Sequence, residues 1–249
     1  MSIASILLIG EGDQTEQVQR LVTKSGAAVR TSTLEANYAG ALANVDLVVE
    51  VVPEKLGLKS QVLEKCDLAA PPKTILATTT RYSGITELGA GTRRPDKVLG
   101  LCLTFNPFRD RCVVEIVKGL ETGQEAVQAC QELFRKAGAE VLDVSDAPGY
   151  VLDRVMAASI NEAINMHMTG VASVEDIDHM LRICLGWPIG PFQFADTIGL
   201  DHILKTLENI SGEQNPHHAP CRLLRKMVAA GKLGKKSGEG FYKYDRKQT

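Results

Sequence analysis

The sequence predicts an α/β fold: a Rossmann-like, doubly wound and mostly parallel sheet, followed by an all-helical C-terminal domain. Three observations carry this prediction. Short apolar runs alternate with helical patterns over roughly the first 145 residues, as expected for strands and helices of a doubly wound sheet. A glycine-rich turn, Gly10-Glu11-Gly12, separates the first apolar run from the first helical pattern. After residue 146 the apolar runs cease and only helical spacing recurs.

The first domain is predicted over residues 1–145. Its first apolar run stops at the glycine turn, and Val18, Leu21 and Val22 then recur at helical spacing. The long apolar run over 45–52 is typical of a strand that is buried on both faces. In chain order the predicted strands cover 5–9, 27–31, 45–52, 74–78, 98–104, 113–117 and 140–144, and the predicted helices cover 14–24, 56–68, 86–89 and 123–137.

The second domain is predicted over residues 146–249, and its composition contains no strand pattern. Ser173 lies three residues before Asp176, which is the spacing of a helix N-cap. We therefore expect a helix to begin after Ser173. The helical patterns of this domain cover 151–168, 174–185, 192–210 and 223–230.

Composition narrows the class of function. The charged fraction is 23% and the formal net charge is -2, so no basic surface for nucleic acid is expected. Six cysteines are scattered without metal-ligand spacing, which predicts buried free thiols in a reducing compartment and no metal site. The N-terminus has no signal-peptide layout, and the apolar run at 3–9 is too short to span a bilayer. We expect a soluble cytoplasmic protein that binds a small molecule or another protein, without nucleic acid or membrane.

Gly10 and Gly12 occupy the place where the pyrophosphate of a dinucleotide rests on backbone N–H groups at a helix N-terminus. This pattern makes both glycines candidate NAD-binding residues. A second interpretation is that the glycines only allow the chain to turn, in a fold that keeps its geometry without the ligand. A third is NADP, held through Arg30 and the hydroxyl groups that follow it.

The turn departs from the usual dinucleotide fingerprint in three ways. Thr15 stands in place of the third glycine, and its side chain is expected to hinder close packing of the helix on the sheet. Glu11 and Asp13 place carboxylates beside the anion site, where they would repel a diphosphate. The second strand ends in residues 30–33, which offer no acid to the ribose hydroxyls.

Short motifs run in order along nearly the whole chain, at 46–50, 85–87, 94–98, 106–107, 146–150, 161–163, 175–178, 188–192, 195–196, 199–201 and 234–242. Together they resemble the L-3-hydroxyacyl-CoA dehydrogenase family. The match is densest in the helical domain. The family pairs a Rossmann-type domain with a helical dimerisation domain and oxidises 3-hydroxyacyl-CoA with NAD.

The resemblance implies a homodimer formed through the helical domain, and it assigns several residues to the site. Glu54 and Lys59 match a glutamate and a lysine that face the nicotinamide side, and Asn106 matches an asparagine that contacts NAD. Glu115 matches the glutamate that orients the catalytic histidine. The alternative for Glu54 and Lys59 is a solvated helix start, and the alternative for Asn106 is a turn before Pro107.

The residues that perform the chemistry in the family are replaced in this chain. The histidine base aligns with Leu103 when counted back from Asn106, and with Cys102 when counted forward from 94–97. All five histidines of the chain lie in the helical domain. The family's substrate-binding serine aligns with Arg81, and the asparagine of its Pro-Gly-Phe-x-x-Asn-Arg motif aligns with Asp153. Glu115, Asp153 and Arg81 are thus the candidate catalytic residues.

Two classes of function follow. The first is an oxidoreductase that acts on a 3-hydroxyacyl-CoA or a similar hydroxy acid with weak or altered activity, or a repurposed enzyme whose substrate carboxylate or phosphate meets Arg81. The second is a non-catalytic homologue, a pseudoenzyme that serves as a binding, regulatory or oligomerisation partner. Residues 34–45 leave room for one short helix where the family has a long helical hairpin over CoA, so the lid over the substrate is expected to be small.

Overall fold

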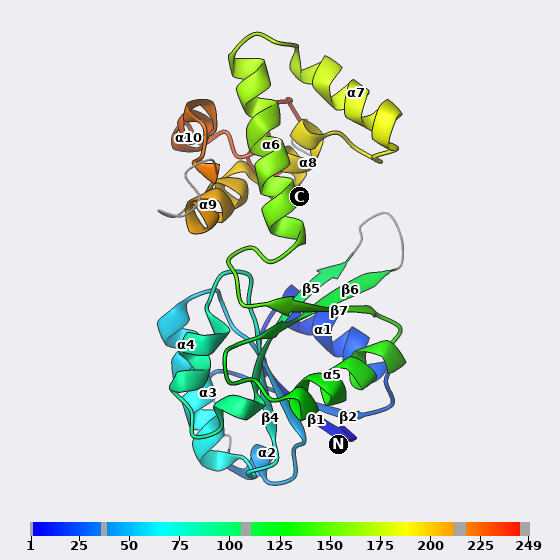
Figure 1. The fold of residues 1–249 in the computed structure, drawn as a ribbon, viewed down its shortest axis with the longest axis vertical. Helices are drawn as coiled ribbons and strands as arrows, with labels where there is room; N and C mark the ends of the chain where they lie inside the picture. Colours follow the sequence, from blue (N-terminus) through cyan, green and yellow to red (C-terminus); the bar gives the residue numbers. More distant parts are fainter. Residues whose placement is uncertain (1, 36–38, 106–110, 212–217, 245–249) are drawn as a thin grey trace. The chain divides into compact units, whose positions relative to one another are not determined.

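The computed structural model describes residues 2–35, 39–105, 111–211 and 218–244. The chain divides into two compact units, Met1–Tyr150 and Val151–Thr249. Figure 1 shows a sheet with helices on both faces in the first unit and helices in the second. The division falls after the predicted boundary at residue 145, because the intervening residues bond to the first unit. The carboxylate of Asp146 accepts a hydrogen bond from the Thr86 amide (2.9 Å), and the Gly149 amide donates to the Arg81 carbonyl (3.0 Å).

The first unit holds a seven-stranded, mostly parallel sheet in the order β2-β1-β3-β4-β5-β6-β7. β6 runs antiparallel to β5, and it pairs in parallel with β7. The fold class is therefore the predicted one, with one reversal at the β5–β6 connection. The strands are β1 Ser5–Gly10, β2 Ala28–Ser32, β3 Leu47–Val51, β4 Ile75–Thr79, β5 Val98–Phe105, β6 Cys112–Lys118 and β7 Glu140–Ser145.

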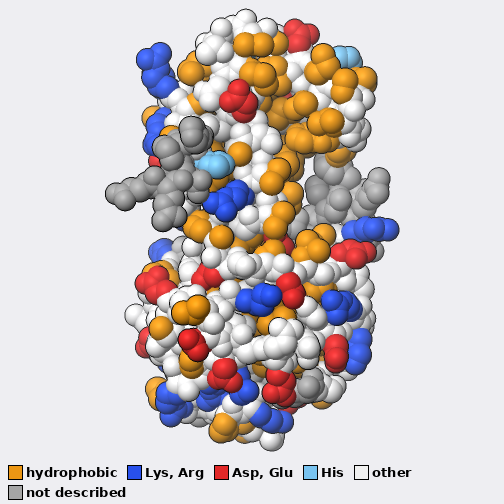
Figure 2. Space-filling view, in the orientation of Figure 1, with side chains coloured by type: hydrophobic (Ala, Val, Ile, Leu, Met, Phe, Trp, Pro, Cys, Tyr) orange, Lys and Arg blue, Asp and Glu red, His pale blue; other side chains and the backbone are white. Residues whose placement is uncertain are grey.

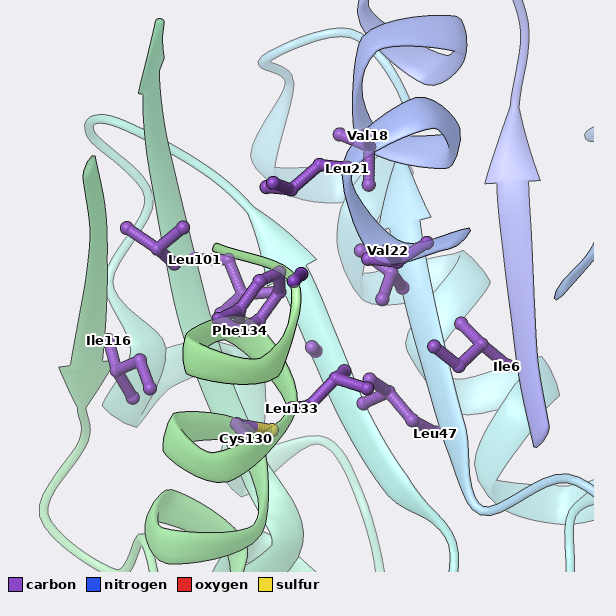
Figure 3. Packing of buried hydrophobic residues seen from close by; sticks show 14 of the residues in the cluster. Ile6, Val18, Leu21, Val22, Leu47, Leu101, Ile116, Cys130, Leu133 and Phe134 are labelled. Atoms are coloured by element: carbon purple, nitrogen blue, oxygen red, sulfur yellow. The ribbon is translucent and has the colours of Figure 1, made fainter. Parts of the chain in front are cut away.

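Two apolar clusters sandwich this sheet, because each strand points alternate side chains to opposite faces. On one face α1 and α5 cover the sheet, and Val18 and Phe134 are fully buried there (Figure 3). On the other face α3 and α4 cover it, with Leu63 and Leu88 buried. The helices are α1 Asp13–Thr23, α2 Ala39–Leu42, α3 Leu56–Ala69, α4 Ile85–Ala90 and α5 Gln124–Lys136, with a 3-10 turn η1 at Pro95–Lys97.

The second unit is built around α6, which packs against α8, α9 and α10. The predicted cap at Ser173 is confirmed, since the Asp176 amide donates to its hydroxyl at 3.1 Å. The single helix predicted over 192–210 is wrong, because Gly199 adopts φ 110 and separates α8 from α9. The elements are α6 Leu152–Met168, α7 Val174–Leu185, α8 Pro191–Ile198, α9 Leu200–Ile210, α10 Arg222–Ala229 and a 3-10 turn η3 Lys235–Ser237.

A buried carboxylate fastens the C-terminal residues of the second unit. Asp196 is 1% exposed, and it accepts hydrogen bonds from the amides of Phe241 (3.0 Å) and Tyr242 (2.9 Å) and from the Tyr244 hydroxyl (3.0 Å). A side chain at Gly240 would lie 2.0 Å from this carboxylate, so only glycine fits there. Asp196 and Gly240 thus have structural roles in the helical unit.

All six cysteines are free, and five of them are buried; Cys184 is exposed, contrary to the prediction of buried thiols throughout. Within the described ranges, no helix is both long and apolar enough to cross a membrane. Within the same residues, no group of three or more metal-binding side chains comes together.

Candidate active site

The glycine turn at the end of β1 has the geometry of a dinucleotide-binding turn. A Cβ at Gly10 would lie 2.4 Å from the Val51 carbonyl oxygen, so the turn passes too close to β3 for any other residue. Gly12 has φ 83, which favours glycine, and it precedes α1 without a side-chain cap. The first N–H groups of α1 are thus left for a ligand, as an anion site at a helix N-terminus requires. The turn therefore fits the pyrophosphate of a dinucleotide.

Thr15 fits into this turn instead of holding the helix away from the sheet. Thr15 is only 5% exposed. A Cβ at Gly10 would lie 2.9 Å from the Thr15 hydroxyl, so this hydroxyl occupies the space that the missing side chain of Gly10 leaves. The Thr15 hydroxyl has no hydrogen-bond partner in the described part of the chain. Glu11 and Asp13 are exposed to solvent, which screens their repulsion of a diphosphate. The expected hindrance by Thr15 is not found.

Lys59 forms a fully buried ion pair with Glu50. Both side chains are 0% exposed, and the ammonium lies 3.2 and 3.3 Å from the two carboxylate oxygens. It also donates to the carbonyls of Val52 (3.1 Å) and Thr79 (2.6 Å). Glu50 accepts further bonds from the Thr78 hydroxyl and the Val52 amide, both at 2.5 Å. Burial raises the pKa of Glu50, and the Lys59 charge and these hydrogen bonds oppose the rise.

This geometry corrects the sequence-based interpretation of Lys59. The side chain is not part of a solvated helix start, and its three ammonium hydrogens are shared among acceptors inside the protein. Its place is to tie α3 to the carboxyl ends of β3 and β4. Any effect of Lys59 on a cofactor would therefore be indirect, through the residues at those strand ends. Its partner Glu50 lies in the middle of an apolar run and was not among the predicted site residues.

Glu54 holds the loop that follows β4. Its carboxylate accepts hydrogen bonds from the hydroxyls of Thr80 (2.6 Å) and Ser83 (2.8 Å), and from the amides of Ser83 (3.2 Å) and Arg81 (3.3 Å). Burial alone would raise the pKa of Glu54, but the Thr80 hydrogen bond, the Lys59 charge and the Ser83 hydrogen bond outweigh it and lower the pKa. Glu54 therefore stays ionised at neutral pH and shapes the segment that carries Arg81.

Arg81 extends from this loop to β5. Its Nη2 donates a hydrogen bond to the Leu103 carbonyl at 3.3 Å, and its own carbonyl accepts the Gly149 amide at 3.0 Å. The guanidinium, which is always charged, therefore lies beside the strand that carries the family's histidine position. The structure thus brings Glu54, Arg81 and that strand together within the first unit.

The pairing of β5 with β6 identifies the position of the missing base. Glu115 lies directly opposite Cys102, and Leu103 lies opposite Val114. Residues that are directly opposite on paired antiparallel strands point to the same face of the sheet. Glu115 and Cys102 therefore share one face.

Leu103 points to the other face. Leu101 and Ile116 lie on that face with Phe134 of α5 (Figure 3), and Leu103 packs against the same cluster. Cys102 belongs to the cluster beneath α3 and α4. Of the two alignments left open by the sequence, we therefore infer that Cys102, and not Leu103, stands where a histidine would face Glu115.

The remaining predicted site residues are Asp153, Asn106 and Glu115. Asp153 lies in the first turn of α6, in the second unit. Asn106 lies outside the described residues. Glu115 is 4% exposed on β6. The glycine turn, the loop after β4 and the β5–β6 pair all lie at carboxyl ends of parallel strands or beside them, where ligands bind in open α/β sheets. This arrangement is typical of a dinucleotide-binding enzyme.

Comparison with known proteins agrees with this class. Residues 10–147 match the family described as 3-hydroxyacyl-CoA dehydrogenase, NAD binding domain, and residues 149–244 match 3-hydroxyacyl-CoA dehydrogenase, C-terminal domain. The chain belongs to the 3-hydroxyacyl-CoA dehydrogenase family, whose cofactor is NAD.

Individual relatives support the assignment over most of their length. The chain is 41% identical over 241 residues to a probable 3-hydroxybutyryl-CoA dehydrogenase of Bacillus subtilis, covering 96% of this chain and 81% of that protein. It is 35% identical to the human mitochondrial hydroxyacyl-coenzyme A dehydrogenase, over 90% of this chain and 70% of that protein. The crystal structure of (S)-3-hydroxybutyryl-CoA dehydrogenase from Ralstonia eutropha superposes with TM-score 0.93 at 28% identity, covering 98% of this chain and 100% of that one.

Proposed function

We propose that the protein catalyses the NAD-linked interconversion of a 3-hydroxyacyl-CoA, or a similar hydroxy acid, and its 3-oxo form, more slowly than relatives that carry the histidine. The main support is the match of both family domains, combined with a glycine turn that fits the dinucleotide. Nothing in the comparisons favours the alternative of a non-catalytic partner protein. Absence of a positioned base is expected to lower the rate by about two to four orders of magnitude.

The residues of the first unit have distinct proposed roles. NAD, when bound at Gly10 and Gly12, supplies the acceptor for hydride. Arg81, held by Glu54 beside β5, attracts the carbonyl, carboxylate or phosphate oxygen of the substrate and orients it. Glu115 provides a carboxylate on the same face as Cys102. Asp153, in the first turn of α6, offers an acceptor where the family's motif has a donor.

The substrate is proposed to be less enclosed than in the family. The described part of the segment between β2 and β3 contains the four-residue helix α2, where a long hairpin covers CoA in the family. We therefore expect weaker discrimination among acyl groups and a higher KM for the CoA ester.

A binding titration followed by an assay tests this function. NADH and NADPH are titrated separately by cofactor fluorescence, and NADH oxidation is then followed with acetoacetyl-CoA. Saturable NADH binding with slow turnover is the expected result. If neither binding nor turnover is found, the dehydrogenase assignment of activity is overturned and the partner-protein alternative is favoured. Binding without turnover on any 3-oxo substrate also contradicts the proposal.

The protein is further proposed to be a cytoplasmic homodimer formed through the helical unit. Figure 2 shows hydrophobic side chains gathered on the surface of that unit, on the side where Figure 1 labels α7. Met180, Ile183 and Leu185 of α7 are each at least 60% exposed, which is unusual for a helix of a monomeric protein. Sedimentation equilibrium should give twice the chain mass of 26.9 kDa, and a monomer at micromolar concentration would contradict the proposal.

A further inference from the structure

Tyr150 carries two unusual features at the end of the first unit. Its φ of 40 makes it the single non-glycine residue with a positive φ in the described part of the chain. Its side chain is 5% exposed, and its hydroxyl has no hydrogen-bond partner among the described residues. Both features destabilise a fold, since an L-residue is strained in this region and a buried donor without an acceptor loses its hydration. Such features commonly mark a functional position.

The neighbours of Tyr150 explain why its hydroxyl has no partner. The nearby Thr80 hydroxyl donates its one hydrogen to Glu54 at 2.6 Å, and it accepts the amides of Tyr82 (3.2 Å) and Ser83 (2.9 Å). A hydroxyl has one hydrogen and two lone pairs, so Thr80 is saturated and cannot accept from Tyr150. The Tyr150 ring packs in the same buried cluster as Cys102. The Tyr150 hydroxyl is therefore buried and unbonded in the cluster that contains Cys102, on the face that Cys102 shares with Glu115.

The phenol of Tyr150 remains protonated at physiological pH. Burial raises its pKa well above the usual range, and the negative charge that Cys102, Asp146 or Glu54 would carry raises it further. The nearby Thr80 hydroxyl opposes this rise of the pKa, although the two hydroxyls do not form a hydrogen bond. Such a phenol keeps its hydrogen and can donate it in a hydrogen bond.

We propose that the hydroxyl of Tyr150 donates a hydrogen bond to the reacting oxygen of the substrate, on the sheet face where Glu115 lies opposite Cys102. This inference rests on the proposed function. As hydride from NADH adds to the carbonyl carbon and the C=O π bond opens, a fixed neutral donor stabilises the negative charge that develops on the oxygen, which then takes its proton from water. Tyr150 aligns with the phenylalanine of the family motif Pro-Gly-Phe-x-x-Asn-Arg, so this hydroxyl is an addition to a chain that lacks the histidine.

The position of Tyr150 also gives the hydroxyl a route to a ligand. It is the last residue of the first compact unit, so a change of conformation at this boundary would alter its backbone torsions. A rotation that relieves its positive φ also moves the side chain. Ligand binding would then supply the acceptor that the protein interior does not.

The decisive variant is Tyr150→Phe, because it restores the residue of the family motif and removes the hydroxyl alone. We expect kcat for NADH oxidation with acetoacetyl-CoA to fall about 10- to 100-fold. We expect binding of acetoacetyl-CoA, measured by calorimetry, to weaken several-fold, while NADH affinity stays unchanged. The Tm should stay constant or rise, since an unpartnered buried hydroxyl is lost.

Tyr242→Phe is the matched control. The Tyr242 hydroxyl donates to Asp178 at 2.9 Å in the helical unit, so its removal should lower the Tm and leave kcat and acetoacetyl-CoA binding unchanged. In addition, the pH profile of wild-type kcat should lack the inflection between about pH 6 and 7 that a histidine base produces. The profile thus separates a phenol donor from a titrating base.

The outcomes are distinguishable. If wild-type protein reduces acetoacetyl-CoA and Tyr150→Phe does so with the same kcat and affinity, the role of Tyr150 is refuted and the proposed function stands. If the wild-type protein binds neither NADH nor acetoacetyl-CoA, both proposals fail. A histidine-like inflection in the wild-type profile also refutes the role of Tyr150.

Discussion

Replacing Lys59 with methionine should destabilise the first unit more than any surface substitution. The variant leaves the Glu50 carboxylate with the Thr78 hydroxyl and the Val52 amide as donors, but without its counter-charge. It also leaves the carbonyls of Val52 and Thr79 without the ammonium that they bond. Removing one partner of a buried ion pair costs about 3–5 kcal/mol, a large part of the 5–15 kcal/mol that holds a typical domain together.

The matched control is the same substitution at an exposed pair. Lys73 lies 2.9 Å from Asp46, but its side chain is 63% exposed, so Lys73→Met should cost about 1 kcal/mol or less. A second control, Lys59→Met with Glu50→Leu, should recover most of the loss, because no charge remains buried.

Urea unfolding followed by two signals measures the effect. The single tryptophan, Trp187, lies in the second unit, so its fluorescence reports that unit, whereas far-ultraviolet circular dichroism reports both. Lys59→Met should shift the circular dichroism transition to lower urea and move the Trp187 transition less. The two transitions are analysed separately, since a chain of two units need not unfold in two states.

The pH dependence of the free energy of unfolding tests whether the buried Glu50 charge destabilises the variant. Burial raises the pKa of Glu50 above its ordinary 4.5, and the variant removes the Lys59 charge that opposes this rise. An acid with a raised folded pKa destabilises the fold above that pKa, and the penalty is relieved as the pH falls through it. The deficit of Lys59→Met should thus shrink from about pH 7 to about pH 5. A cost no larger than that of Lys73→Met would refute this reasoning.

Three further substitutions test other parts of the first unit. Gly10→Ala should lower NADH affinity at least about tenfold in a fluorescence titration, because its Cβ would lie 2.4 Å from the Val51 carbonyl oxygen, and unchanged affinity would contradict the turn geometry. Cys102→His should raise turnover of acetoacetyl-CoA by roughly 10²-fold, whereas Leu103→His should not; equal effects would refute the inferred strand register at the base position. Glu54→Gln should lower the free energy of unfolding in urea by about 1–3 kcal/mol at neutral pH and by little at about pH 3. The reason is that folding lowers the pKa of Glu54 below its ordinary 4.5, so the carboxylate stabilises the fold above pH 4.5 and this contribution is lost as the pH falls through the folded pKa. A cost that does not change with pH would contradict this assignment.

Local sequence patterns predicted most elements of the fold, because apolar periodicity reflects which faces are buried. The run over 45–52 became β3, buried on both faces, and the cap at Ser173 formed as its spacing indicated. Periodicity alone did not separate α8 from α9, because helical spacing continues across Gly199. The signal was the glycine itself, whose positive φ ends one helix and starts the next.

The site was predictable only where its residues follow one another along the chain. Gly10 and Gly12 adopt the expected turn, because two glycines between an apolar run and a helical pattern indicate it in the sequence. The contact that requires glycine at position 10, with the Val51 carbonyl of β3, is not visible in the sequence. The Lys59–Glu50 pair and the position of Cys102 depend on contacts that the sheet creates between distant residues. One insertion between aligned motifs shifts every side chain of a strand to the other face, so counting along the chain could not choose between Leu103 and Cys102.

The carboxylate of Asp196 bears on how the protein folds during its synthesis. Its partners Phe241, Tyr242 and Tyr244 are made more than forty residues later, as the separation of 45 between Asp196 and Phe241 shows. Until they leave the ribosome, closing the helical unit would bury a carboxylate without donors. The sheet of the first unit is complete at Ser145 and has no such dependence. The nascent chain should therefore acquire a protease-resistant first half while its helical half is still open to cleavage.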